Sequence, residues 1–362
     1  MKAAVLHESP GELVIEDVSI DKPAANEVLV QTTNAGLCHS DLHFMDGHYS
    51  TRMPAVMGHE SAGIVQAVGE DVEYVKPGDH VIACLSVFCG NCQDCLSGAP
   101  YRCRNNRAVS RPKGATPRLS KDGETYQQFA RLGGFAEEML VHQNALVKVD
   151  RDMPLDKAAL IGCGVTTGMG AVFRTAAVRP GETVVVIGAG GIGLSAIQAA
   201  RIAGAGMVIA VDVTDEKLET AKTVGATHGI NAITVQDPVQ AVKELTGGLG
   251  VDYAFEALGM KVTAEQAFHM IRPGGTATVI GMVPVGENIE IPGHELLNDK
   301  KLQGSMMGSN QFRTDMPRMV DMYLDGRLLL DEMVSQTISL DQINEGYQDM
   351  RDRKVARTVI NF

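Results

Sequence analysis

Six of the seven cysteines in this chain fall into two groups whose composition suits metal binding. The first group is compact and occupies a single segment: Cys89, Cys92, Cys95 and Cys103. Four thiolates complete a tetrahedral shell around zinc and leave no coordination position free, which is typical of a structural site. The alternative is a set of buried or redox-active thiols, and the tight clustering argues against it. We therefore predict a structural zinc in this segment.

The second group is scattered and consists of Cys38, the pair His59 and Glu60, and Cys163. A set of cysteine and histidine ligands of this kind can leave one position open for water or a substrate, as in catalytic zinc sites. The spacing alone leaves open that His59 is an ordinary buried histidine. The seventh cysteine, Cys84, is predicted to be a buried apolar thiol.

A glycine-rich turn follows the β-branched run Thr183–Ile187 and matches the pattern G-x-G-x-x-G. Its residues are Gly188, Ala189, Gly190, Gly191, Ile192 and Gly193. Such a turn between a strand and a helix lets the backbone approach a pyrophosphate, which the N-terminus of the helix then faces. The alternative is a purely structural turn. We therefore predict a dinucleotide site.

Asp212 ends the next predicted strand, where an acidic side chain binds the ribose 2′-hydroxyl of the cofactor. Its charge would repel a 2′-phosphate, so NAD is favoured over NADP. A helix-capping role is the alternative for Asp212. Lys217, in the following predicted helix, could also reach the ribose or be an ordinary surface lysine.

The elements that position these residues change in character near Cys163. Before it, short strands and turns prevail, with a loop-like stretch from Gly90 to Gly134. After it, buried β-branched runs alternate with amphipathic segments, which predicts a doubly wound α/β sheet. The expected elements are Thr183–Ile187, Leu194–Ala203, Val208–Val211, Asp215–Val224, Val251–Phe255 and Thr276–Ile280.

Composition excludes several classes of function. The 362 residues carry a net charge of -12, so there is no basic excess to neutralise the phosphates of a nucleic acid or an anionic membrane. No signal peptide and no apolar run of about 20 residues are present, so we expect a cytoplasmic protein that does not enter a membrane. Seven cysteines without a secretory signal fit a reducing compartment.

The combined motifs resemble the zinc-dependent alcohol dehydrogenases of the medium-chain dehydrogenase/reductase superfamily. The resemblance covers essentially the whole chain and rests on the following segments in their order: Cys38–Asp41, Gly58–Gly69, the four-cysteine segment, Gly162–Gly168 and the glycine turn. It implies a mostly-β, GroES-like catalytic domain formed by residues 1–164 and 307–362. A doubly wound NAD-binding Rossmann domain, residues 165–306, would be inserted in it, with the active site in the cleft between the two.

The resemblance also implies roles for individual residues. Cys38, His59 and Cys163 would be ligands of the catalytic zinc, with Glu60 close behind it and Asp41 orienting the His59 ring. Ser40 and His43 would form a proton relay. The residues implied to contact NAD are His39, Thr167 and Arg357, and those implied to line the substrate pocket are Tyr49 and Leu85. Solvated polar residues remain the alternative for His39, His43 and Arg357.

The function implied is reversible, NAD-linked oxidation of primary or secondary alcohols, medium-sized or aromatic, with two zinc ions per chain. A glutathione-linked formaldehyde dehydrogenase remains an alternative within the family. Zinc-free quinone or enoyl reductases of the superfamily lack the Cys38, His59 and Cys163 set, so its presence argues against that class. A non-enzymatic NAD-binding protein would have lost zinc ligands or relay groups, and none is missing in this sequence. The long Cys103–Phe135 segment resembles that of the dimeric branches of the family, which implies a homodimer rather than a homotetramer.

Overall fold

The computed structural model describes residues 1–352 and 354–362, and these form two compact units. Unit 1 comprises Met1–Gly164 and Gln311–Phe362, and unit 2 comprises Val165–Asn310. Unit 1 is therefore discontinuous in sequence, because unit 2 is inserted in it. The second boundary lies a few residues after the one expected from the sequence.

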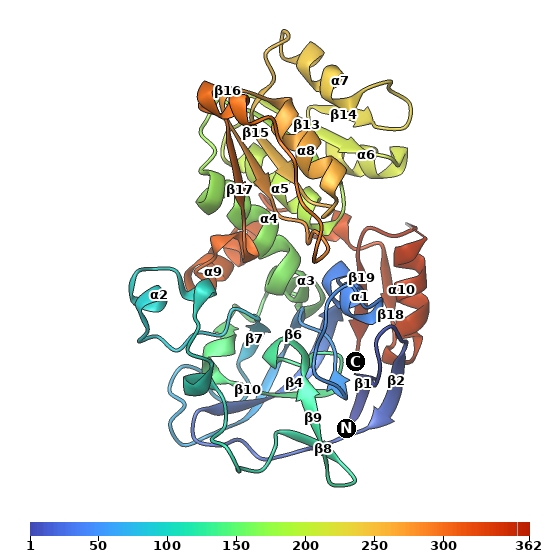
Figure 1. Cartoon of the computed structure of the whole chain (residues 1–362). Coiled ribbons are helices and arrows are strands. Elements are labelled where there is room, and N and C mark those ends of the chain that lie inside the picture. Colours follow the sequence, from blue (N-terminus) through green and yellow to red (C-terminus); the bar gives the residue numbers. More distant parts are fainter. Residues whose placement is uncertain (353) are drawn as a thin grey trace. The chain divides into compact units, whose positions relative to one another are not determined.

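Unit 1 is built on two sheets (Figure 1). The first has the order β2 (Leu13–Asp17), β1 (Lys2–Leu6), β5 (Ala55–Val56), β9 (Glu124–Gln128), β8 (Leu119–Lys121) and β3 (Ser19–Ile20). The second has the order β11 (Leu146–Lys148), β7 (His80–Ala83), β6 (Ser61–Val68), β4 (Glu27–Gly36), β19 (Thr358–Asn361) and β18 (Gln336–Ile338), with β10 (Glu138–His142) also paired with β4. Most of these pairs are antiparallel, as expected for a mostly-β unit.

The C-terminal residues complete the second sheet of unit 1. Strand β19 pairs antiparallel with β4 and parallel with β18, so the last strand of the chain lies beside one of the first (Figure 1). The helices of this unit are α1 (His39–Met45), α2 (Gln93–Leu96), α3 (Leu155–Leu160), α9 (Phe312–Leu324) and α10 (Ile343–Arg351). The side chains of α10 that are buried belong to a core shared with Leu37, Met57 and Phe135.

The stretch from Gly90 to Gly134 differs from the loop that composition suggested. It contains the hairpin β8–β9, which pairs with β3 and β5 of the first sheet. Asp122 and Gly123 form the two-residue turn, both with positive φ angles of 49° and 84°. Asp-Gly is the residue pair that such hairpin turns prefer, so this signal was present in the sequence and outweighs the surrounding glycine and proline content.

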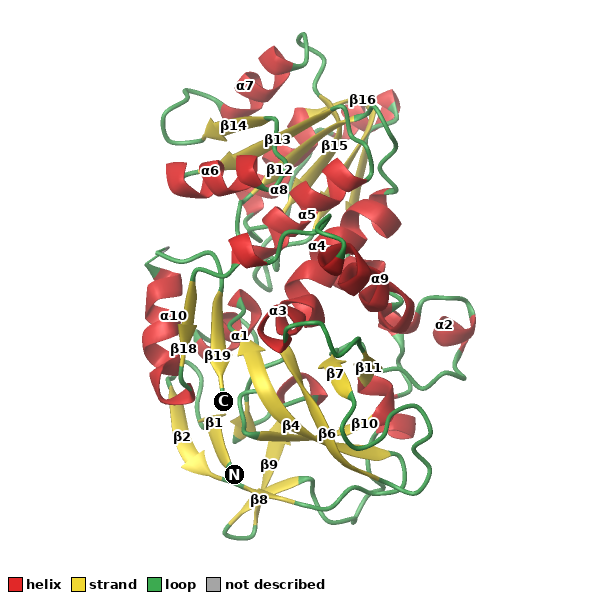
Figure 2. Cartoon of the chain, turned by 180° about the vertical axis from the view of Figure 1, so that it is seen from behind, coloured by secondary structure: helices red, strands yellow, loops and turns green. Residues whose placement is uncertain are grey.

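Unit 2 is a parallel six-stranded sheet surrounded by helices (Figure 2). Its strand order is β14 (His228–Asn231), β13 (Met207–Asp212), β12 (Thr183–Ile187), β15 (Val251–Glu256), β16 (Ile271–Val279) and β17 (Lys301–Gly304). Its helices are α4 (Thr166–Gly170), α5 (Gly191–Ile202), α6 (Asp215–Thr223), α7 (Pro238–Leu245) and α8 (Lys261–Met270). The order reverses between β12 and β15, which defines a doubly wound fold and marks where such sheets bind ligands. The predicted fold class is confirmed.

Candidate metal and dinucleotide sites

Four buried residues of unit 1 bring metal-binding atoms together. The ligand atoms of Cys38, His59, Glu60 and Cys163 all lie within 4.8 Å of one another. Cys38 directly precedes α1, and His59 and Glu60 directly precede β6. Cys163 lies in a single π-helical turn, residues Ile161–Val165, a distortion that is frequent at functional sites. Residues far apart in the sequence thus form one cluster.

The surroundings of His59 suit a metal ligand. Its Nδ1 lies 3.0 Å from Oδ2 of Asp41, whose Oδ1 accepts a hydrogen bond of 3.1 Å from the backbone N–H of Gly58. The contact between His59 and Asp41 is close but lacks the alignment of a directed hydrogen bond. A carboxylate at Nδ1 leaves Nε2 for a metal, and Nε2 is buried without a partner among the described residues. The donor set therefore fits zinc.

The charges of this cluster reinforce one another. Hydrogen bonding from Cys163 and the positive charges of His59 and Arg357 lower the pKa of Cys38 well below its ordinary value, although burial opposes this. Burial alone would lower the pKa of His59, but the charges of Asp41 and Cys38 outweigh it and raise it to about 10. A thiolate is thus stabilised where a cation would bind, which is the ligand state that zinc requires.

Behind this cluster, Arg357 and Glu60 form a buried ion pair. The guanidinium Nη2 of Arg357 donates to Oε2 of Glu60, and the two side chains are 6% and 0% exposed. A Cβ atom at Gly36 would lie 2.7 Å from that oxygen, so glycine makes room for the pair. The sequence led us to expect Arg357 to contact a cofactor phosphate. The structure instead gives it Glu60 as a partner, and the phosphate contact stays a prediction.

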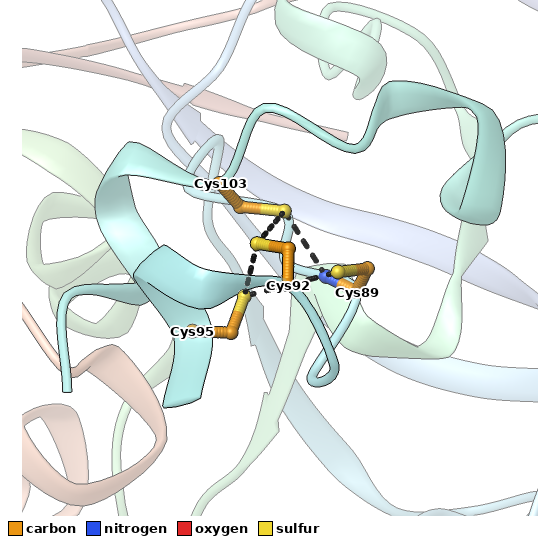
Figure 3. A group of neighbouring side chains, drawn as sticks. All are labelled: Cys89, Cys92, Cys95 and Cys103. Carbon is orange, nitrogen blue, oxygen red and sulfur yellow. Dashed lines mark hydrogen bonds between the residues drawn. The ribbon is translucent and has the colours of Figure 1, made fainter. Parts of the chain in front are cut away.

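The four cysteines of the compact group surround a common point (Figure 3). Their Sγ atoms are 3.9 Å apart for Cys89 and Cys95, 3.5 Å for Cys92 and Cys95, and 3.8 Å for Cys92 and Cys103. Zn–S bonds of about 2.3 Å in a tetrahedron would place the sulfurs about 3.8 Å apart. These separations are too long for disulfide bonds, and none of the seven cysteines, all of which the structure describes, forms a disulfide. The group therefore fits a zinc ion as well.

In unit 2, the glycine turn has the geometry of a phosphate-binding loop. Gly188 has a φ of 95°, and α5 begins at Gly191 directly after the extended residue Gly190. A Cβ atom at Gly193 would lie 1.7 Å from the carbonyl oxygen of Gly188, so only glycine permits this close packing. Ile192 lies in the first turn of α5. The turn thus leaves the first N–H groups of the helix free to face a phosphate.

Asp212 is held against this turn. Its Oδ2 accepts a hydrogen bond of 2.7 Å from the N–H of Ala189, and its Oδ1 accepts bonds of 2.7 and 3.1 Å from Val213 and Thr214. The carboxylate therefore has a fixed position at the end of β13. Lys217 lies in α6 and is partly exposed.

Comparison with known proteins identifies the family. Residues 24–151 match the alcohol dehydrogenase GroES-like domain, and residues 191–324 match the zinc-binding dehydrogenase domain. An NDMA-dependent alcohol dehydrogenase from Amycolatopsis methanolica is 40% identical over 99% of this chain and 98% of its own length. This chain belongs to the zinc-type alcohol dehydrogenases of the medium-chain superfamily. The resemblance noted in the sequence and the predicted alcohol dehydrogenase function are confirmed.

Two solved structures extend the comparison to the whole fold of this alcohol dehydrogenase. Benzyl alcohol dehydrogenase from Acinetobacter calcoaceticus is 33% identical with a TM-score of 0.93, and the match covers 100% of this chain and 99% of that one. A zinc-binding dehydrogenase from Sinorhizobium meliloti 1021, bound to NADP, is 27% identical with a TM-score of 0.84 and the same coverage. No helix among the described residues of the dehydrogenase is long and apolar enough to cross a membrane.

The other predicted site residues of the alcohol dehydrogenase lie in both units. In unit 1, Ser40 and His43 are half-buried and three positions apart on α1, so they share a face of the helix, while His39 is exposed. Leu85 and Tyr49 are half-buried, and the Tyr49 ring lies 6.1 Å from that of His43. Burial and the neighbouring His48 lower the pKa of His43.

In unit 2, the predicted contact Thr167 lies on α4 and is 5% exposed. Its hydroxyl donates to the sulfur of Met307 over 3.5 Å. Among the remaining cysteines, Cys84 is fully buried as expected, and burial raises its pKa to about 11.

Tyr347 is a residue near the metal cluster that the sequence did not indicate. It lies on α10 and is fully buried, and burial together with the charges of Asp41 and Cys38 raises its pKa well above the ordinary value. The only signal in the sequence is an aromatic residue on the buried face of an amphipathic helix, which normally indicates core packing.

Proposed function

We propose that this alcohol dehydrogenase catalyses the reversible, NAD-linked oxidation of medium-sized or aromatic alcohols to aldehydes or ketones. The observation that carries the proposal is the buried cluster of Cys38, His59, Glu60 and Cys163, with Asp41 beside the His59 ring. Such a donor set is that of a catalytic zinc, because three nitrogen and sulfur ligands leave a position for the substrate.

We assign Cys38, His59 and Cys163 as the ligands of this zinc. When bound, zinc supplies Lewis-acid polarisation of the alcohol oxygen. Asp41 lies beside Nδ1 of His59 and would orient the imidazole, which leaves Nε2 to hold the metal. Oε2 of Glu60 is paired with Arg357, whereas Oε1 is buried without a hydrogen bond to any described residue, so we assign Oε1 as a further ligand during exchange.

Ser40 and His43 are assigned to proton transfer. The hydroxyl of Ser40 accepts the proton of the alcohol, and the proton leaves through His43 towards solvent. The lowered pKa of His43 keeps its imidazole neutral at neutral pH, so a ring nitrogen can accept a proton. His43 is half-buried and its neighbour His48 is exposed, which supports an outward path.

We assign the turn Gly188–Gly193 and Asp212 to the dinucleotide, which supplies the hydride acceptor. Gly190, Gly191 and Ile192 present backbone N–H groups to the pyrophosphate, and Asp212 binds the adenosine ribose. The additional contacts assigned to the cofactor are Lys217, Thr167, His39 and Arg357. The fixed carboxylate of Asp212 supports NAD as the preferred cofactor.

Substrate size is inferred from Tyr49 and Leu85, which we assign to the substrate pocket. Both are half-buried and present apolar surface, and the Tyr49 ring adjoins His43 of the relay. The similarity to a benzyl alcohol dehydrogenase supports aromatic alcohols among the substrates.

We further propose a second, structural zinc on Cys89, Cys92, Cys95 and Cys103, and assembly as a homodimer in the cytoplasm. A surface of unit 2 supports the dimer. Strand β17 lies at the end of the parallel sheet, and Leu296 and Leu297 just before it are 46% and 88% exposed. The edge of a sheet beside exposed apolar side chains is a favourable surface for a second copy of the chain. Light scattering of the purified protein measures the assembly.

A second candidate concerns the electron acceptor. Because the Amycolatopsis relative is named as NDMA-dependent, we also propose that turnover in this chain depends on NDMA. The test compares a panel of primary, aromatic and secondary alcohols with NAD alone, with NDMA alone and with both, before and after removal of zinc.

Zinc-dependent formation of NADH with NAD alone supports the main proposal. Turnover that requires NDMA supports the second candidate, and absence of turnover under every condition overturns both.

A further inference from the structure

We propose that Glu256 is a positioning residue of the dinucleotide site, which it serves by holding the turn after β15 against Gly188. This role rests on the proposed function, in which the turn Gly188–Gly193 binds NAD. Glu256 is the last residue of β15, and its side chain is fully buried. None of the sequence motifs includes it.

Glu256 lies at the point of the sheet where a dinucleotide binds. Strand β15 pairs parallel with β12, and Glu256 lies opposite Ile187, which ends β12 and directly precedes Gly188. The strand order reverses between β12 and β15, and doubly wound sheets bind dinucleotides at the carboxyl ends of the strands at that point. The end of β15 therefore lies beside the glycine turn that follows β12.

One oxygen of Glu256 accepts three hydrogen bonds from the segment that follows it. Oε1 accepts from the N–H of Leu258 at 2.9 Å, from the N–H of Gly259 at 2.8 Å and from the hydroxyl of Thr263 at 2.8 Å. Thr263 lies in the first turn of α8, where the helix dipole favours a negative charge. Glu256 thus closes the connection between β15 and α8 into a turn of fixed shape.

Backbone contacts join this turn to the strands on both sides. The N–H of Ala257 donates to the carbonyl of Ile187 at 2.9 Å, and the carbonyl of Glu256 accepts from the N–H of Gly281 at 3.1 Å. A Cβ atom at Gly281 would lie 2.0 Å from the backbone nitrogen of Gly259, so only glycine permits this approach. The turn is therefore packed between the segments that follow β12 and β16.

Leu258 connects the turn to the dinucleotide site. Its side chain lies so close to Gly188 that a Cβ atom at Gly188 would be 2.8 Å from both Cγ and Cδ2 of Leu258. Gly188 has a φ of 95°, and glycine has great conformational freedom, so contact with a fixed neighbour limits its movement. The contacts thus run from Glu256 through Leu258 to Gly188, the first residue of the turn assigned to the pyrophosphate.

The second oxygen of Glu256 indicates which substitution keeps this role. Oε2 is buried and has no hydrogen bond to any residue that the structure describes. The three donors therefore need only one acceptor oxygen, which the side-chain amide of glutamine also carries. Glu256→Gln keeps that oxygen, whereas Glu256→Ala removes it and leaves buried donors without an acceptor.

The test separates cofactor binding from stability. In the zinc-loaded full chain, we would compare wild type with Glu256→Gln, Glu256→Ala and Leu258→Ala. The measurements are Tm, the dissociation constant of NADH by calorimetric titration, and kcat and KM for NAD with one alcohol. Leu258→Ala leaves the hydrogen bonds of the turn in place, and its side chain is 45% exposed, so this variant decides the matter even if Glu256→Ala does not fold.

Asp252→Ala is the matched control, because Asp252 lies near the opposite end of the same strand. Its Oδ2 likewise accepts from a backbone N–H and from a hydroxyl, both of Thr183 and both at 2.7 Å. The amino ends of the strands are not where doubly wound sheets bind ligands. Asp252→Ala should therefore lower Tm without weakening the binding of NADH.

Glu256→Ala and Leu258→Ala should each weaken the binding of NADH by about 10-fold, which is the effect of about one hydrogen bond. The KM for NAD should rise by a similar factor, and kcat should change far less, because the groups assigned to proton transfer are not touched. Glu256→Gln should bind NADH nearly as well as wild type.

Wild-type affinity for NADH in Leu258→Ala would overturn the proposed role of Glu256. Equal weakening in Asp252→Ala would also overturn it, since the effect would then follow from lost stability alone. Binding by Glu256→Gln as weak as that by Glu256→Ala would show that an acceptor oxygen is not what matters. A wild-type chain that binds no NADH would instead overturn the proposed use of NAD, so the two failures are distinguishable.

Discussion

Asp212→Asn should shift cofactor selectivity from NAD towards NADP. Two unit charges about 4 Å apart repel by about 1 kcal/mol in water and by about 4 kcal/mol at an effective dielectric constant of about 20. Three backbone N–H groups fix the Asp212 carboxylate, so it cannot turn away from a 2′-phosphate. Gly190 and Gly191 beside it are partly exposed, so we take a repulsion of about 1–2 kcal/mol between Asp212 and the 2′-phosphate. Removing it should change the ratio of kcat/KM with NADP to kcat/KM with NAD by about 5–30-fold.

The ratio of the two cofactors isolates the charge from the other effects of the substitution. Asparagine keeps one oxygen for Val213 and Thr214 but places an amide NH₂ near the N–H of Ala189. The unsatisfied N–H costs about 1–3 kcal/mol and weakens both cofactors alike, so it cancels in the ratio.

The assay is steady-state turnover of one alcohol with NAD and with NADP. Asp215→Asn is the matched control, since this exposed acid lies three residues further on and bonds to Asn231. An unchanged ratio in Asp212→Asn, or the same change in the control, would refute the electrostatic reasoning.

Three further substitutions test the other parts of the molecule. Cys95→Ala should lower Tm and zinc content more than it lowers kcat of the folded enzyme, because one of four sulfurs around a common point is lost. Ser40→Ala should reduce kcat by about 10²–10⁴-fold with unchanged zinc content, since a relay hydroxyl is not a ligand. Glu27→Gln should lower Tm by about 6–20 °C, because breaking a buried ion pair costs about 3–5 kcal/mol and each kcal/mol shifts Tm by about 2–4 °C. Glu27 is 3% exposed and accepts from Arg111 at 2.6 Å and from Arg118 at 2.7 Å. Burial would raise the pKa of Glu27, but these arginines outweigh it and lower the pKa below its ordinary 4.5. The difference in Tm between wild type and Glu27→Gln is therefore full above about pH 4.5 and disappears as the pH falls through the pKa of Glu27 in the folded protein.

For each of these three predictions, one result would contradict the reasoning. A Cys95→Ala protein as stable as wild type would show that the four thiols hold no stabilising metal. Full turnover in Ser40→Ala would remove this hydroxyl from the relay. If the Tm difference caused by Glu27→Gln were independent of pH, the ion pair would not account for it.

The parallel sheet of unit 2 could be predicted because its strands are marked by short β-branched runs that can be recognised without knowing which strands pair. The run Thr183–Ile187 is β-branched throughout and became β12 with the same ends. Hairpin β8–β9 was missed, because glycine, proline and arginine dominate its surroundings and only Asp122 and Gly123 signal the turn. Its strands exist through pairing with β3 and β5, which no local pattern shows.

The candidate sites also differ in how much of each could be predicted from the sequence. The four-cysteine group could be predicted from spacing alone, whereas the set of Cys38, His59 and Cys163 required the resemblance to a family. The partners of these residues could not be predicted, since Glu60 and Arg357 are 297 residues apart and nothing local in the sequence links them. Tyr347 likewise shows only the apolar periodicity of a core helix.

The insertion of unit 2 into unit 1 has a consequence for the order of events on the ribosome. The residues of unit 1 that precede the insertion emerge first, but β19, Arg357 and Tyr347 follow only after all of unit 2. At a synthesis rate of about 5–20 residues per second, the 297 residues between Glu60 and Arg357 correspond to about 15–60 seconds. Until Arg357 has been made, the thiols of Cys38 and Cys163 are without their final surroundings, whereas the four-cysteine segment is complete as soon as Cys103 has been made. The two proposed zinc ions are therefore expected to load at different times, the one at the four cysteines early in translation and the one at Cys38, His59 and Cys163 at its end.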